Sequence, residues 1–488
     1  MSIAHTAAAF RHDTQRIFKL AWPVLVGQLA VLAFGTIDTI LLARMGSQDL
    51  AALAVGSAAY ITVFVGLMGV LLAIGPIVGH HYGAQQWDEA GQEFHQGIWL
   101  ALGLSLLGAA VLAFPQPFLA LAQVEGEVAR GIRGYLAALA FALPASLLFT
   151  VYRGFNTAIS RPRAVMNLQL AALAAKLPLS VVLAWGVPVL GIPSMGVVGC
   201  GVATAVVMWL QCAAAAWILR QDEHYAPYRL PFCAAGRALD APDVSRLRGL
   251  LRLGIPMGAG ILVEVTGFTF MAIFIARLGA LPVAGHQIAA NLAALLFMVP
   301  LALSNATSTL VAQRLGARAP LDAQTLAWRG VQLAALMALL MGGALYAGRE
   351  AVVGLYTRDA AVASAALVLM AWLVWFHLAD ALQTMAALVL RAYRVATVPV
   401  VIYAVALWGV GLGGGHLLAF RDPPQAGGPA AWIPWATGAR GFWVASTVSL
   451  WLAAALLLGL MAWVIRLKTA QALRDAAQTV PLDAARAG

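Results

Sequence analysis

Twelve long apolar segments follow one another along this chain, and each is long enough to cross a lipid bilayer as a helix. A spanning helix needs about 20 apolar residues, because the hydrocarbon core is about 30 Å thick. The chain is 62% hydrophobic and only 10% charged, with a mean hydropathy of +0.85, whereas a soluble domain carries about 25% charged residues. We therefore predict an all-α polytopic membrane protein. The predicted spans are 17–45, 50–78, 93–114, 131–157, 164–186, 195–220, 250–278, 283–312, 325–347, 360–392, 396–420 and 436–467.

The two halves of the chain match each other without a gap. Pro23 and Pro256, Arg44 and Arg277, and Gly83 and Gly316 all lie 233 positions apart. Six spans in each half give both copies the same orientation, which predicts two six-helix lobes related by a pseudo-twofold axis along the membrane normal, with a cavity between them. The predicted domains are an N-terminal tail (1–16), an N-lobe (17–220), a cytoplasmic connector (221–249), a C-lobe (250–467) and a C-terminal tail (468–488).

Basic residues favour one side of the predicted topology. Of the 30 Lys and Arg, 21 fall in the two tails and the loops that share their side, and 8 fall in the opposite loops. By the positive-inside rule, both termini are predicted to be cytoplasmic, in a multi-pass protein of the cell inner membrane. The net charge of +10 is spread over short loops, which argues against a nucleic-acid partner. The first apolar segment lacks an A-x-A cleavage pattern, so we expect a retained span.

Three acids interrupt the apolar segments: Asp38, Glu264 and Asp380. A carboxylate at membrane depth costs about 3 kcal/mol on insertion scales and usually marks an ion or substrate path. The chain has no G-x-x-x-x-G-K-[ST] motif and no soluble domain to house one. An ion gradient is therefore the expected energy source for any uphill transport.

Asp38 has one natural partner among the basic residues. Lys176 is the only one well inside a predicted span, and it reaches Asp38 if the first and fifth spans touch. Asp38 is then either a proton or cation site of the N-lobe or half of a structural ion pair. A nearby lysine can hold the acid ionised and be released when the acid is protonated. Both interpretations stay open at this stage.

The other two acids belong to the C-lobe. Asp380 shares one face of its helix with Phe376, His377, Gln383 and Thr384, because residues three and four apart are neighbours. Two acids in one lobe can share a proton or a cation, and hard oxygen ligands suit Na⁺ or H⁺ rather than a transition metal. A structural hydrogen-bonded pair is the alternative. His377 either relays protons or bonds a neighbouring backbone group.

Other polar residues carry less functional signal. Cys200, Cys212 and Cys233 form no CxxC pair and no disulfide framework, and we expect small apolar fillers. His80 and His81 lack an acid in a ligand pattern, so no metal site is predicted. His286 and Asn291 are expected to pack or cap. Most tryptophans and tyrosines, Tyr403 among them, are expected at membrane interfaces or in the core.

Several motifs resemble one family of membrane transporters. Residues 20–25 read LAWPVL and 38–40 read DTI, while 199–205 read GCGVATA. The second half adds LGIP at 253–256, EVT at 264–266, AGHQ at 284–287 and GFW at 441–443. Together they resemble the multidrug and toxic compound extrusion (MATE) family, in particular its NorM-like branch, over about residues 15–468.

The resemblance implies a V-shaped pair of six-helix bundles that exports small organic cations in exchange for Na⁺ or H⁺. It implies no cofactor, no enzymatic activity, no obligatory protein partner and a role in drug resistance. The family's N-lobe aspartate corresponds to Asp38, and its C-lobe cation-binding acids correspond to Glu264 and Asp380. A flippase for lipids or lipid-linked precursors, of the same broad fold, is the alternative, although acids in the cavity argue against it.

The chain departs from the NorM-like pattern at two places. Lys176 and Ser180 stand where two asparagines are common, and Phe376 stands where a tyrosine is common one turn before Asp380. Lys176 would occupy the space of a cation beside Asp38, which shifts the expected ion site to Glu264 and Asp380. The coupling ion stays open between Na⁺ and H⁺.

Overall fold

The computed structural model describes residues 3–188, 191–231, 233, 238–420 and 436–478. Parts of the predicted tails and of the connector therefore lie outside the described residues. Within the described residues, twelve helices are long and apolar enough to cross a membrane, which confirms the predicted spans in number and in order.

The helices run as follows: α1 (Ile3–Ala43), α2 (Ser47–Leu71), α3 (Ile74–Gly83), α4 (Trp87–Ala113), α5 (Gln116–Ala122), α6 (Gly126–Ala158), α7 (Pro162–Trp185), α8 (Gly196–Gln221), η2 (Glu223–Tyr228), α9 (Val244–Ala276), α10 (Ala280–Gly316), α11 (Pro320–Ala347), α12 (Arg349–Tyr356), α13 (Ala360–Ala392), α14 (Thr397–Tyr403), η3 (Ala404–Gly413), α15 (Gly414–Ala419) and α16 (Gly438–Gln478).

Helix limits extend beyond the predicted apolar limits at several ends. The helix α4 begins at Trp87 rather than at residue 93, and α16 continues to Gln478 rather than ending at 467. The short helices α5 and α12 lie outside every predicted span. An apolar run reports only the part of a helix that lies in lipid, whereas backbone hydrogen bonding continues the helix into polar sequence.

The repeat is visible in the backbone. The start of α2 at residue 47 lies 233 positions before the start of α10 at residue 280. The end of α3 at residue 83 lies 233 positions before the end of α10 at residue 316. The turns that follow contain left-handed residues at the same offset, Gln85 with φ of 58° and Arg318 with φ of 56°. Two copies of one sequence pattern therefore fold into the same local structure.

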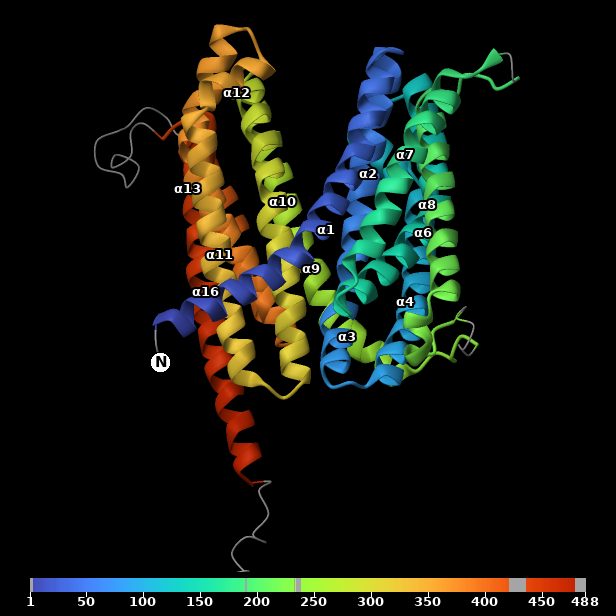
Figure 1. The fold of residues 1–488 in the computed structure, drawn as a ribbon. Helices are drawn as coiled ribbons and strands as arrows, with labels where there is room; N and C mark the ends of the chain where they lie inside the picture. The colour runs from blue at the N-terminus through green and yellow to red at the C-terminus, as the bar shows by residue number, and fades with distance from the viewer. Residues whose placement is uncertain (1–2, 189–190, 232, 234–237, 421–435, 479–488) are drawn as a thin grey trace, which may run out of the picture. The chain divides into compact units, whose positions relative to one another are not determined.

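Interhelical contacts divide the chain into two units. The N-terminal unit covers Trp22–Leu262, and the C-terminal unit covers Val263–Gly488 together with Met1–Ala21. In the N-terminal unit α6 packs against α2, α4 and α8; in the C-terminal unit α13 packs against α10, α11 and α16 (Figure 1). The helices α6 and α13 thus have the same central place, each in its own unit.

Glycines let two helices of the N-terminal unit approach closely. A Cβ on Gly69 of α2 would lie 2.5 Å from Cα of Gly258 in α9, and one on Gly254 would lie 2.2 Å from the carbonyl oxygen of Val70. Without a hydrophobic driving force between helices in lipid, such small-residue contacts provide the packing. Any larger side chain at Gly254 or Gly258 would separate α2 from α9.

The eleventh span, predicted over 396–420, is not a uniform α-helix. Between α14 and α15 it contains η3, a π-helical stretch of 10 residues. The π-helix is rare and is frequently found at functional sites. Its N-cap residue is Tyr403, whose side chain belongs to the site described next.

Candidate functional site

Two of the three acids lie in one hydrogen-bonded cluster of the C-terminal unit. Gln383 donates from Nε2 to Oε1 of Glu264 at 3.2 Å and to Oδ1 of Asp380 at 2.9 Å. The same nitrogen lies 3.1 Å from Oγ1 of Thr384. Helix geometry places Asp380, Gln383 and Thr384 together on α13, whereas only tertiary packing brings Glu264 from α9.

Tyr403 completes this cluster, and the sequence analysis missed its role. Its hydroxyl donates to Oε1 of Gln383, and its side chain is buried. Because the amide oxygen is engaged by Tyr403, the amide nitrogen of Gln383 faces the two carboxylates. The only sequence signal was a phenolic hydroxyl within an apolar segment.

The geometry suits the cluster to hold one small positive species. Asp380 is 9% exposed, Gln383 0% and Thr384 4%. The Gln383 amide has two hydrogens for three facing oxygens, so it cannot satisfy all of them at once. Two carboxylates that share one neutral donor repel each other, and a proton or a hard cation between them relieves that repulsion.

A built-in positive charge accompanies the two acids. Arg391, seven residues beyond Thr384 on α13, interacts electrostatically with Glu264 and Tyr403. The sequence analysis counted Arg391 among the basic residues on the side of the termini. One guanidinium against two ionised carboxylates leaves one negative charge, which a single monovalent ion neutralises.

Phe376 and His377 do not join the carboxylate cluster. The Phe376 ring packs 5.3 Å from Trp443 and 6.5 Å from Phe268. The Nε2 atom of His377 is buried and has no hydrogen-bond partner in the described part of the chain. The same aromatic group includes His286, which accepts from Nε1 of Trp443 at 3.3 Å; the prediction that His286 packs is confirmed.

The third acid lies in the N-terminal unit, where it forms the ion pair with Lys176. The Lys176 Nζ lies 2.7 Å from Oδ1 and 2.9 Å from Oδ2 of Asp38. Nζ also donates to Oγ of Ser180 at 2.9 Å and to the carbonyl oxygen of Cys200 at 3.2 Å. The contact between the first and fifth spans, on which the pairing of Asp38 with Lys176 depended, is therefore present. The sequence offered no signal for the backbone carbonyl, which α8 supplies.

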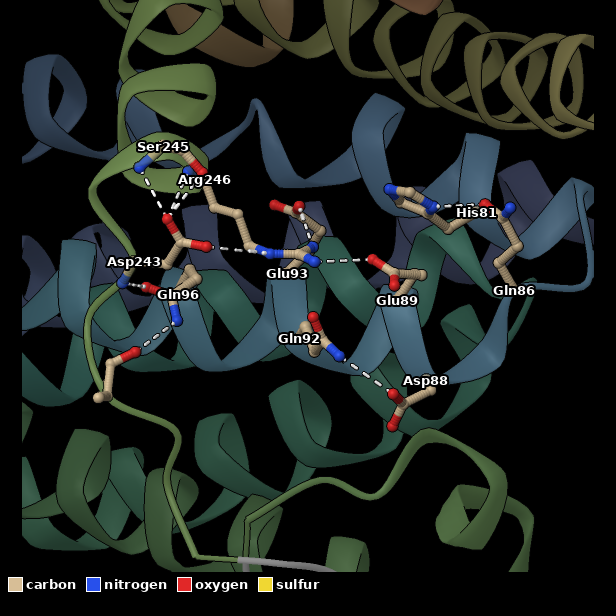
Figure 2. A network of polar contacts seen from close by, with 11 residues as sticks. His81, Gln86, Asp88, Glu89, Gln92, Glu93, Gln96, Asp243, Ser245 and Arg246 are labelled. Carbon is tan, nitrogen blue, oxygen red and sulfur yellow. Dashed lines mark hydrogen bonds and ion pairs between the residues drawn. The ribbon is translucent and has the colours of Figure 1, made fainter.

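A further polar cluster joins the connector to α4 (Figure 2). Glu89, Glu93 and Gln96 lie on one face of α4 at i, i+4 and i+7. Arg246, at the start of α9, points between the two glutamates and donates to Glu89 at 2.8 Å and to Glu93 at 3.0 Å. Gln96 accepts from the backbone N–H of Asp243 at 2.8 Å.

His95 strengthens this attachment from the next face of α4. It accepts at Nδ1 from the Asp240 N–H at 3.0 Å, and its Nε2 lies 3.2 Å from the carbonyl oxygen of Arg229. Trp99 donates from Nε1 to the carbonyl oxygen of Asp240 at 2.7 Å. The printed contacts of this group join the connector and the start of α9 to α4, so we assign the cluster to fold stability.

Replacing Arg246 by Ala is expected to destabilise the protein by about 1–3 kcal/mol, because Glu93 is buried and loses its charged partner. Thermal unfolding in detergent measures the change. The matched control is Arg248→Ala, since Arg248 lies two residues further along α9 and its side chain is exposed. Equal unfolding temperatures for the two variants would show that the Arg246 pairs contribute nothing to stability.

Comparison with known sequences finds one family. The family model described as MatE matches residues 23–182 and 256–415. The two matched stretches start 233 residues apart, which is the offset of the internal repeat. A "Probable multidrug resistance protein NorM" from Aromatoleum aromaticum is 43% identical over 451 residues, covering 92% of this chain and 93% of that protein. "Multidrug resistance protein PmpM" from Pseudomonas aeruginosa is 33% identical, covering 90% and 89%.

Solved structures show the same fold. The structure titled "Crystal structure of MATE in the bent conformation" superposes with a TM-score of 0.82, covering 94% of this chain and 97% of that chain. The sequence identity is only 16%, so this likeness concerns the fold alone.

Proposed function

Since the chain belongs to the MatE family and is a multi-pass membrane protein for multidrug efflux, we propose that it is a secondary active antiporter that exports organic cations in exchange for Na⁺ or H⁺. Export proceeds by alternating access, with the coupling ion entering from outside. The coupling ion binds at the carboxylates of Glu264 and Asp380 in the C-terminal unit, which Gln383 holds together.

The observation that supports this site most directly is the pair of carboxylates that share the Gln383 amide. An acid at membrane depth is costly and is retained for function in transporters. With Arg391 nearby, the cluster carries a net charge of −1 when both acids are ionised. One Na⁺ or one H⁺ makes it neutral, and a neutral cluster is cheaper to move through a low-dielectric environment.

The same negative charge explains why the exported compounds are organic cations. A cationic substrate and the coupling ion both gain energy near Glu264 and Asp380, and each opposes binding of the other. This competition couples the two fluxes, because binding of one ligand lowers the affinity for the other by the same factor.

The remaining features of the proposal follow the distribution of basic residues and the absence of any cofactor motif in the sequence. The protein resides in the cell inner membrane with both termini in the cytoplasm. It needs no cofactor beyond its coupling ion, performs no catalysis and requires no protein partner.

Transport into inside-out vesicles tests the proposal. The vesicles contain the overexpressed protein, and uptake of a fluorescent organic cation is followed with a Na⁺ gradient and, separately, with a pH gradient. We expect uptake under at least one gradient, and its collapse when an ionophore for that ion is added. Absence of uptake under both gradients, with the protein present in the vesicles, would contradict the proposal.

A further inference from the structure

The ammonium group of Lys176 occupies a cage of oxygen atoms. Four oxygens surround Nζ at 2.7–3.2 Å: both carboxylate oxygens of Asp38, Oγ of Ser180 and the carbonyl oxygen of Cys200. The Lys176 side chain is 0% exposed and that of Asp38 is 5% exposed. A fully buried lysine is rare, and here α1, α7 and α8 each contribute oxygen to it.

The oxygens that accept from Lys176 would also suit a metal cation. They belong to a carboxylate, a hydroxyl and a backbone carbonyl, which are the hard oxygen ligands that alkali and alkaline-earth ions prefer. The carbonyl oxygen of Cys200 is fixed in place, because Thr204 also donates to it at 2.9 Å. Ser180 donates to Oδ1 of Asp38 at 3.3 Å, so its oxygen is oriented toward Nζ.

The four oxygens exceed the needs of an ammonium. An ammonium has three N–H donors, yet four acceptors surround it, so the cage offers more coordination than lysine can use. The positive charge itself is required, since an uncharged side chain at this position would leave the Asp38 carboxylate buried without compensation.

We propose that Lys176 is a tethered cation: its ammonium permanently occupies a monovalent-cation site of the N-terminal unit, and removing it exposes a Na⁺ site centred on Asp38. With the native lysine the N-terminal unit binds no coupling ion. It would follow that coupling uses Glu264 and Asp380 alone, and this consequence rests on the proposed function. The Na⁺ site at Asp38 does not rest on the proposed function.

Direct binding of radioactive Na⁺ to purified full-length protein tests this inference. All variants carry Glu264→Gln and Asp380→Asn, so that binding at the C-terminal unit is removed and transport is not needed as a readout. Three proteins are compared on this background. The first has native Lys176 and Asp38, the second carries Lys176→Met, and the third carries both Lys176→Met and Asp38→Asn. Measurements are made at mildly alkaline pH, with N-methylglucamine replacing Na⁺ to hold the ionic strength constant.

We expect saturable binding of one Na⁺ per chain in the Lys176→Met variant only. Binding should be lost when Asp38→Asn is added and should be absent when Lys176 is native. Leu177→Met, at a neighbouring position that is 51% exposed, is the matched control and should bind no Na⁺. If Lys176→Met does not fold, Lys176→Asn replaces it, because a shorter amide fills part of the space and donates to Asp38.

Two results would overturn the inference. One is the absence of saturable Na⁺ binding after Lys176 is removed, which would mean that Asp38 takes a proton instead. The other is Asp38-dependent Na⁺ binding with Lys176 in place. Neither result bears on the C-terminal site, so failure here is distinguishable from failure of the proposed antiport, which the vesicle assay tests.

Discussion

Glu264→Gln and Asp380→Asn are each expected to lower gradient-driven export by about 10- to 100-fold, because each removes a charged ligand of the coupling ion worth about 1.5–3 kcal/mol. The amides keep the size of the acids and can still contact Gln383. The loss should therefore arise from charge and not from packing. Glu264→Gln leaves Asp380 as the one acid that Gln383 contacts, so the negative charge that attracts an ion is reduced.

Uptake of the fluorescent cation into inside-out vesicles measures this effect, normalised to the amount of protein in the membrane. Glu350→Gln is the control, since Glu350 lies on α12 with an exposed side chain (79%). It should transport like the unmodified protein. Full export by both Glu264→Gln and Asp380→Asn would rule out the C-terminal carboxylates as the coupling site.

Asp38→Leu alone is expected to destabilise the protein by about 3–5 kcal/mol, because it leaves the Lys176 ammonium buried and without its counter-charge. Only the Ser180 hydroxyl and the Cys200 carbonyl would remain to accept from Nζ. Asp38→Leu combined with Lys176→Met should recover most of this loss, since a buried ion pair can often be replaced by apolar residues of similar volume.

Thermal unfolding in detergent, followed for the single and double variants, measures the difference. The double-mutant cycle isolates the coupling between Asp38 and Lys176 from the cost of each truncation. If the single and double variants unfold at the same temperature, the ion pair contributes nothing beyond the packing of its side chains, and the ammonium is not held by Asp38.

The candidate site was only partly predictable from the sequence. Asp380, Gln383 and Thr384 were placed together correctly, because helical spacing alone brings residues three and four apart onto one face. The contribution of Tyr403 was missed, and so was the nearness of Arg391 to Glu264. Both are consequences of how α9, α13 and α14 pack, which no local pattern reports.

The surroundings of Lys176 were also only partly predictable from the sequence. The cost of burying a charge in lipid pointed to one partner for Lys176, and the pair forms. The same argument could not reveal the carbonyl oxygen of Cys200, since every residue carries such an oxygen and only the packing of α8 against α7 selects this one.

The sequence by itself determined the number and order of the membrane spans, the internal repeat at an offset of 233 residues, and the family. These features depend on local composition and on patterns within single segments. The spans are readable because lipid requires every spanning backbone to satisfy its own hydrogen bonds, which favours helices of apolar residues. The tertiary structure decided which polar groups meet: Gln383 between Glu264 and Asp380 under the Tyr403 hydroxyl, and four oxygens around Lys176. It also decided the π-helical stretch after Tyr403. Those outcomes depend on which helix faces pack together, and close packing of side chains far apart in the chain settles that choice.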